Sequence, residues 1–368
     1  MKRSLLQLPL FVLIVAGMAI GIVTGLGRLG IELPGPAGER VMLHGPILIA
    51  GVFGTLIALE RAVAMKTLLG RTWTFADLAP ILSGAGLVVL LVDDATTPAI
   101  ALLAAGALVL VAINVYFLRR SPTLDVLTMV LGAAFLLLAD VAWLLGRAVP
   151  FLTAWWVAFL VLTIVGERLE LARLRAHGRV AHGAFATAIA VYVGALLLMI
   201  VDEGLGLRLS GLGMIALATW LLRYDIALLT VRREGLARFV AVCLLAGYAW
   251  LGVSGAIVLL SEPAFGGFSY DAYLHAVLLG FVFSMVFGHA PIIFPAIVER
   301  PIAFTEFAYL PLLLLHFSVA LRILGDLAGN QMIRTAAGAW TGVAIVLYGA
   351  TIVYGLARGH RAATRPPG

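Results

Sequence analysis

Five ionisable side chains lie inside apolar stretches of the sequence, where lipid would surround them. His44 and His275 are near one end of their stretches, His289 and His316 lie deeper, and Asp140 is the one clearly intramembrane carboxylate. Because an ionisable group is costly to bury in a bilayer, such residues are candidates for function. Two histidines on different helices suit axial ligation of haem iron, with each imidazole supplying a neutral nitrogen.

The residues around the two shallower histidines fit a haem site in part. Gly51 follows His44 by seven residues, about two helical turns, and would leave room for a flat ring against the backbone. Arg322 lies near the end of another apolar stretch. It can pair either with a haem propionate or with Asp326, four residues further on.

The stretch that contains His275 has a second histidine and two prolines. His289 follows His275 by fourteen residues, so both lie on one helical stripe at depths roughly 21 Å apart. Pro291 and Pro295 lack the N–H that an α-helix needs. They predict a kink and a freed backbone carbonyl near Phe287.

Each candidate has other interpretations, which the sequence leaves open. His44 and His275 can be hydrated at the headgroup boundary or bonded to a loop carbonyl. His289 and His316 can form interhelical hydrogen bonds, to Asp140 or to a tyrosine. A different functional class is a proton-coupled small-solute permease, in which His289, His316 and Asp140 line the path.

Composition restricts the classes of protein that these residues can serve. Hydrophobic residues make up 62% of the 368 residues and charged residues 12%, with a mean hydropathy of +1.09. Such a chain is too apolar for a water-soluble protein. The net charge of +6 comes from short basic clusters between apolar runs, which are typical of topology signals and not of nucleic-acid binding. Cys243 is the single cysteine, so no disulfide is expected.

Twelve apolar stretches predict the elements that must position the candidate residues. We expect an all-α polytopic membrane bundle that forms a single domain over residues 1–368. The predicted spans are residues 6–27, 41–63, 76–93, 97–118, 123–146, 150–170, 183–201, 208–223, 238–260, 271–297, 304–327 and 334–357.

The distribution of basic residues predicts the orientation of these spans. On alternate sides of the predicted membrane, Lys and Arg number 19 and 6. Since basic residues favour the cytoplasmic side, we expect both termini in the cytoplasm and the protein in the inner membrane. The lipid bilayer is then its first partner.

Two weaker patterns concern packing. Glu-Arg pairs at residues 60–61, 167–168 and 299–300 recur every four spans, which indicates either three four-helix units or chance in basic loops. Gly17, Gly21 and Gly25 recur every four residues in the first span, a pattern that lets a neighbouring helix approach closely.

With these features, the sequence resembles two groups of haem proteins. Twelve spans with histidines at the outer ends of spans two and ten are similar to the catalytic subunit of haem-copper oxidases. The stretch from His275 through Gly288, His289 and Pro291 resembles the NnrS family, twelve-span haem proteins linked to nitric oxide and nitrosative stress.

The resemblance implies a cofactor and a ligand set. In the haem-copper pattern, histidines of spans two and ten ligate the low-spin haem, which corresponds here to His44 and His275. We therefore expect a b-type haem, a role in nitric oxide response or membrane redox chemistry, and a diatomic gas or a redox protein as partner. Copper ligation would need histidines in spans six and seven, but the predicted spans 150–170 and 183–201 contain none. No copper centre is expected.

Overall fold

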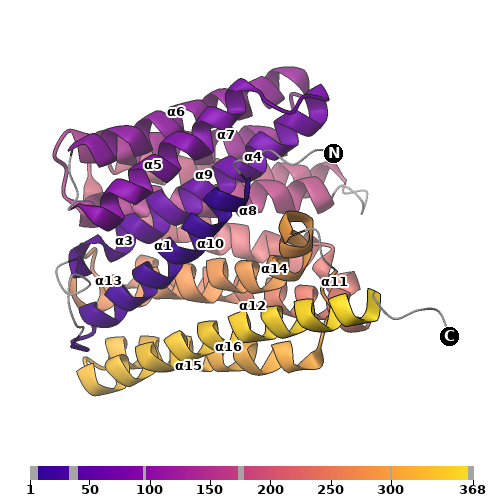
Figure 1. Ribbon diagram of the computed structural model, residues 1–368. Coiled ribbons are helices and arrows are strands. Elements are labelled where there is room, and N and C mark those ends of the chain that lie inside the picture. Colours follow the sequence, from indigo (N-terminus) through magenta and orange to yellow (C-terminus); the bar gives the residue numbers. More distant parts are fainter. Residues whose placement is uncertain (1–6, 33–39, 94–96, 173–177, 299–300, 364–368) are drawn as a thin grey trace. The chain divides into compact units, whose positions relative to one another are not determined.

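The structure is a computed structural model that describes residues 7–32, 40–93, 97–172, 178–298 and 301–363. Every element in these ranges is helical (Figure 1). Twelve helical stretches of the described residues are long and apolar enough to cross a membrane, and each overlaps one predicted span. The prediction of an all-α polytopic membrane bundle is confirmed.

The chain divides into two compact units, residues 1–170 and 171–368. The single domain stays a prediction. Each unit is described by itself. The six spans of the first unit are α1 (Gln7–Arg28); η1 (Val41–Leu43), α3 (His44–Pro46), η2 (Ile47–Phe53) and α4 (Gly54–Leu69) in succession; η3 (Phe75–Asp77) with α5 (Leu78–Val92); α6 (Thr97–Arg120); α7 (Leu124–Leu144); and α8 (Val149–Ala172).

The second unit also has six spans, of which the fourth is again composite. They are α9 (Arg179–Leu198); α10 (Glu203–Tyr224); α12 (Gly235–Leu260), preceded by the short α11 (Ala227–Thr230); α13 (Gly267–His275), η5 (Ala276–Val282) and α14 (Phe283–Val298) in succession; η6 (Glu306–Ala308) with α15 (Tyr309–Leu327); and α16 (Gln331–Ala363).

Local signals in the sequence set several helix ends. Asp202 precedes α10, and its carboxylate accepts a hydrogen bond from the Leu205 N–H at 2.9 Å, which satisfies one of the unpaired donors of the first turn. Gly70 ends α4 with φ of +63°, a left-handed conformation that glycine adopts without strain. The following turn is closed by a buried ion pair of 2.7 Å between Lys66 and Asp77.

Small residues allow close packing of helices within each unit. In the first unit, a Cβ atom on Gly132 or Gly166 of α7 and α8 would lie 3.1 Å or closer to atoms of the facing helix. In the second unit, Gly211 of α10 and Gly255 of α12 face each other. Because lipid offers no hydrophobic drive for helix association, such close van der Waals contact is a main source of membrane-helix stability.

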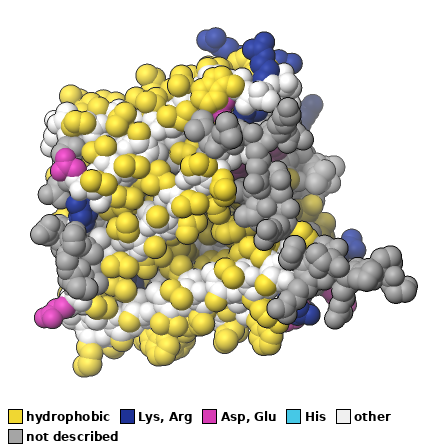
Figure 2. All heavy atoms as spheres, in the orientation of Figure 1, with side chains coloured by type: hydrophobic (Ala, Val, Ile, Leu, Met, Phe, Trp, Pro, Cys, Tyr) yellow, Lys and Arg dark blue, Asp and Glu magenta, His cyan; other side chains and the backbone are white. Residues whose placement is uncertain are grey.

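Helix α12 is the centre of the second unit. It packs against α10, α13, η5 and α14, while α15 and α16 pack along each other and α15 also contacts α13 (Figure 1). Figure 2 shows apolar side chains along the helices and charged side chains gathered near their ends. This distribution suits helices whose sides contact lipid and whose ends contact water.

Candidate functional site

His44 is the first residue of α3 in the second span and is held by the first span. Its ring nitrogen Nδ1 is 2.6 Å from the carbonyl oxygen of Gly21 in α1. A carbonyl can only accept, so Nδ1 carries the proton. In a neutral imidazole the lone pair then lies on Nε2, which is the state that binds a metal.

Gly17, Gly21 and Gly25 of α1, the glycine stripe, form the surface against which span two packs at His44. A Cβ atom on Gly25 would lie 2.5 Å from Cε1 of His44, and one on Gly17 would lie 2.9 Å from Val52. A Cβ atom on Gly21 would overlap the side chain of Leu48. His44, Leu48 and Val52 thus follow one face of span two along the stripe, and the prediction of a packing motif is confirmed.

A leucine side chain lies in the space beside Gly51. A Cβ atom at this position would lie 2.7 Å from Cδ1 of Leu87 in α5. Gly51 is therefore a place where α5 approaches span two, and its role beside a macrocycle stays a prediction.

His275 is the last residue of α13 in the second unit. Its Nδ1 is 2.9 Å from the carbonyl oxygen of Asp271 and 3.3 Å from Oδ2 of the same residue. Nδ1 therefore carries the proton here too, shared between two oxygens, and the lone pair of the neutral ring lies on Nε2.

A buried cluster of charges surrounds Asp271. Arg322 of α15 donates to it from Nε at 2.9 Å and from a terminal nitrogen at 3.2 Å. Arg334 of α16 lies 2.9 Å from the same carboxylate and 3.0 Å from Asp326. The predicted pair of Arg322 with Asp326 is thus wrong, because Arg322 binds Asp271 and Asp326 binds Arg334. A propionate contact of Arg322 stays a prediction.

Both candidate histidines lie within three residues of the start of a rare helix conformation. The seven-residue segments η2, which starts three residues after His44, and η5, which starts one residue after His275, are π-helical. Such segments are uncommon and occur often at functional sites. The sequence does not show them, because seven residues are fewer than the roughly 11–18 over which apolar periodicity can be read.

The Nδ1 bond alone does not single out these two histidines. Nδ1 of His289 is 2.7 Å from the Met285 carbonyl oxygen, and Nδ1 of His182 is 3.3 Å from the Gly178 carbonyl oxygen. Neither of them precedes a π-helical segment. The combination of tautomer and helix type is what sets His44 and His275 apart.

Pro291 of α14 has one of the two predicted effects on the backbone, and the kink stays a prediction. Pro291 has no N–H to give the Phe287 carbonyl, and the hydroxyl of Tyr348 in α16 donates to that oxygen instead. The rings of Phe287 and Tyr348 are stacked with centroids 3.8 Å apart. The freed carbonyl near Phe287 is confirmed, and the residue that satisfies it comes from another helix.

His316 is part of a different hydrogen-bonded chain. Trp250 donates from its ring N–H to Nδ1 of His316 at 3.0 Å, so the proton of a neutral ring lies on Nε2. That nitrogen is 3.5 Å from Oγ of Ser284, whose hydroxyl donates to the Cys243 carbonyl at 2.7 Å. This tautomer is opposite to that of the two candidate ligands.

Asp140 has a partner within the first unit. The ring N–H of Trp156 in α8 donates to its carboxylate at 2.8 Å, and both residues are buried. The sequence had suggested Asp140 or a tyrosine as partner of the deep histidines. In the structure the hydrogen-bond partner is a tryptophan in both cases. Trp156 donates to Asp140, and Trp250 donates to His316.

The Glu-Arg pairs form a link between spans and not within one. Arg61 of α4 makes an ion pair of 2.7 Å with Glu167 of α8. The third pair, residues 299–300, lies outside the described residues. The first two pairs thus connect spans two and six of the same unit.

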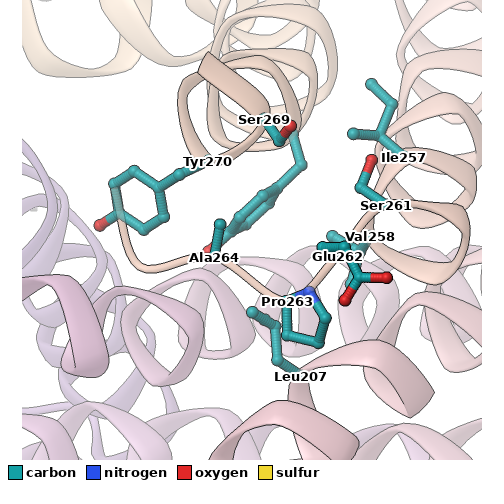
Figure 3. Close-up of a pocket in the computed structure, with 10 residues that line it drawn as sticks. Leu207, Ile257, Val258, Ser261, Glu262, Pro263, Ala264, Ser269 and Tyr270 are labelled. Atoms are coloured by element: carbon teal, nitrogen blue, oxygen red, sulfur yellow. The ribbon is translucent and has the colours of Figure 1, made fainter. Parts of the chain in front are cut away.

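A small pocket lies beside the start of α13 (Figure 3). It is lined by residues of α10, α12, α13 and the segment 261–266. Its cavity volume of about 10 Å³ is about what one water molecule needs. Tyr273, two residues before His275, lines it, and its buried hydroxyl has no hydrogen-bond partner among the described residues.

Within the described residues, no three His, Cys, Asp or Glu side chains form a group that could hold a metal ion. The candidates are instead single histidines, His44 in the first unit and His275 in the second. A metal carried by a macrocycle needs only one or two protein ligands.

Comparison with known families assigns the chain. A family described as "Domain of unknown function (DUF8744)" matches residues 7–356. The chain belongs to this family. The match covers the full set of membrane spans up to the last turns of α16, and both candidate histidines lie within it. No curated protein matches the sequence. The resemblance to NnrS and haem-copper proteins stays a prediction.

Proposed function

We propose that this member of the DUF8744 family is a haem-binding integral membrane protein in which His44 and His275 supply nitrogen ligands to iron. The observation that carries the proposal is the recurrence of one arrangement in two places. Each histidine has its proton on Nδ1, and each leads into a seven-residue π-helical segment. The tautomer suits ligation through Nε2, and π-helical turns are common at functional sites.

The residues of the chain would hold and orient the imidazoles. Gly21 and Gly25 give the His44 ring a carbonyl acceptor and a flat surface. Asp271 gives His275 a carbonyl and a carboxylate. A haem bound there would supply one-electron chemistry or gas binding. Because Cys243 is the single cysteine, covalent attachment through a Cys-x-x-Cys-His motif is excluded, and a b-type haem is proposed.

The proposed setting is the inner membrane with both termini in the cytoplasm. It rests on the split of 19 against 6 basic residues, because basic residues favour the cytoplasmic side. Reporter fusions after Arg120, after Arg175 and at the C-terminus should report cytoplasm. Fusions near Asp94 and Gly267 should report the opposite side, and a C-terminus outside the cytoplasm would overturn the orientation.

A visible spectrum of the detergent-purified protein tests the haem proposal. The protein from haem-sufficient cells should show sharp reduced-minus-oxidised bands of low-spin iron, and His44→Leu and His275→Leu should each give a high-spin spectrum or apoprotein. His182→Leu is the matched control, since His182 has the same Nδ1 bond in an exposed position. A carbon monoxide difference spectrum then tests for a diatomic gas as ligand.

Two results would contradict the proposal. Colourless wild-type protein, or wild-type spectra in both histidine variants, would remove the haem assignment. The permease hypothesis with His289, His316 and Asp140 would then be pursued by transport assays. In the structure these residues have separate partners, Met285, Trp250 and Trp156, so that hypothesis has no observation of its own in its favour.

A further inference from the structure

Asp271 lies one helical turn before His275 and offers it two acceptors. The backbone carbonyl is 2.9 Å from Nδ1 and the carboxylate oxygen Oδ2 is 3.3 Å away. The histidine proton is therefore directed at a carboxylate as well as at a neutral carbonyl. A carboxylate behind an imidazole fixes the ring and raises its basicity as a metal ligand.

Two arginines from other helices fix this carboxylate. Arg322 of α15 reaches both of its oxygens, and Arg334 of α16 adds a contact at 2.9 Å. Asp271 and Arg322 are 7% and 5% exposed, so the pairs are shielded from solvent and from salt. Two guanidinium groups compensate the carboxylate charge, and bidentate contacts fix its plane.

We infer that Asp271 is the positioning residue of His275. It orients the imidazole through the shared Nδ1 proton. Its second effect rests on the proposed function: the carboxylate increases electron donation from Nε2 to iron. Arg322 and Arg334 hold the carboxylate in place from α15 and α16. The state of His275 is thereby coupled to the packing of three helices of the second unit.

The first test uses nitrogen NMR of the full-length chain labelled at histidine, in detergent without added haem. The seven histidines are assigned by single His→Gln variants. Asp271→Asn keeps the shape and the backbone carbonyl but removes the charge. It should move the Nδ1 resonance of His275 toward that of His44, whose acceptor is a neutral carbonyl.

Asp202→Asn is the control. It removes a carboxylate of the same unit that lies outside the cluster and accepts a hydrogen bond from the Leu205 N–H, not from His275. The His275 resonance should stay in place in this variant. Equal shifts in both Asn variants, or none in Asp271→Asn, would overturn the inference whether or not the protein binds haem.

The second test uses haem-loaded protein. Asp271→Asn should weaken haem binding about 10- to 100-fold and raise the midpoint potential, because a weaker donor stabilises ferric iron less. Arg322→Gln removes a countercharge and should lower the potential. A purely structural role would shift both variants alike.

Arg322→Gln also keeps the inference testable if Asp271→Asn does not fold. In apoprotein it should move the His275 Nδ1 resonance away from that of His44, because the carboxylate becomes the stronger acceptor. An unmoved resonance would contradict the positioning role. Correct NMR shifts in a protein that never binds haem would instead reject the proposed function and leave the positioning of His275 standing.

Discussion

His44 in the first unit and His275 in the second share a tautomer and an adjoining π-helical segment, but their surroundings differ in charge. The acceptor of His44 is the carbonyl of Gly21, and its ring lies over Gly25. The acceptors of His275 include the carboxylate of Asp271, which two arginines hold. One imidazole is positioned by close backbone packing and the other by a buried ion cluster.

The difference indicates how each position should respond to change. Packing against glycine is sensitive to volume, because a single methyl group has no space. An ion cluster is sensitive to charge, because removing one partner leaves another charge buried. The following predictions test this contrast, beginning with the largest expected effect.

Asp271→Leu should give the largest loss of stability. It leaves Arg322 and Arg334 buried without their shared counterion, and breaking a buried ion pair in this way costs about 3–5 kcal/mol. Thermal unfolding in detergent measures the effect. The double variant with Arg322→Leu should lose less than the sum of the two single changes. Simple additivity would contradict the cluster.

Gly25→Ala should disturb the packing of the His44 ring against α1. The new methyl group would lie 2.5 Å from the ring, and overpacking of this kind costs about 1–3 kcal/mol. Gly45→Ala is the control, because no atom lies within 4 Å of its added Cβ. Unfolding temperatures should fall for Gly25→Ala only. If both variants match the wild type, the glycine stripe does not hold His44.

Tyr348→Phe should have a smaller effect, about 0.6–1.7 kcal/mol, the range for membrane hydrogen bonds. It removes the donor to the Phe287 carbonyl. In a Pro291→Ala background, a backbone N–H is available for that carbonyl, so the same change should cost nothing. Tyr354→Phe on the exposed side of α16 is the control. An undiminished cost in the Pro291→Ala background would show that the hydroxyl has another role.

His289→Leu should leave the haem spectrum unchanged, the smallest effect of the series. His289 shares the Nδ1 bond of His275 but does not precede a π-helical segment. Spectra of the purified variant and of His275→Leu provide the comparison. Loss of the haem bands in His289→Leu, with His275→Leu unaffected, would move the ligand to His289.

Most of the fold could be predicted from the sequence because the bilayer demands it. A span needs about 20 apolar residues with all backbone groups bonded within the helix, so hydropathy located all twelve. The proline rule also located the freed carbonyl of Phe287 correctly. Side-chain partners were harder, since Arg322 lies four residues from Asp326 yet binds Asp271, 51 residues away. Contacts between helices far apart in the chain leave no local signal.

The sequence by itself determined the helical bundle, its twelve spans, the candidate histidines and the glycine stripe of α1. These follow from hydropathy, residue type and spacing, which act along a single helix. Only the tertiary structure decided the partner of each polar side chain, the two π-helical segments and the filling of the space at Gly51 by Leu87. Those features depend on which helix faces which, because a buried polar group takes the nearest available partner and a glycine gives space to whatever side chain approaches it.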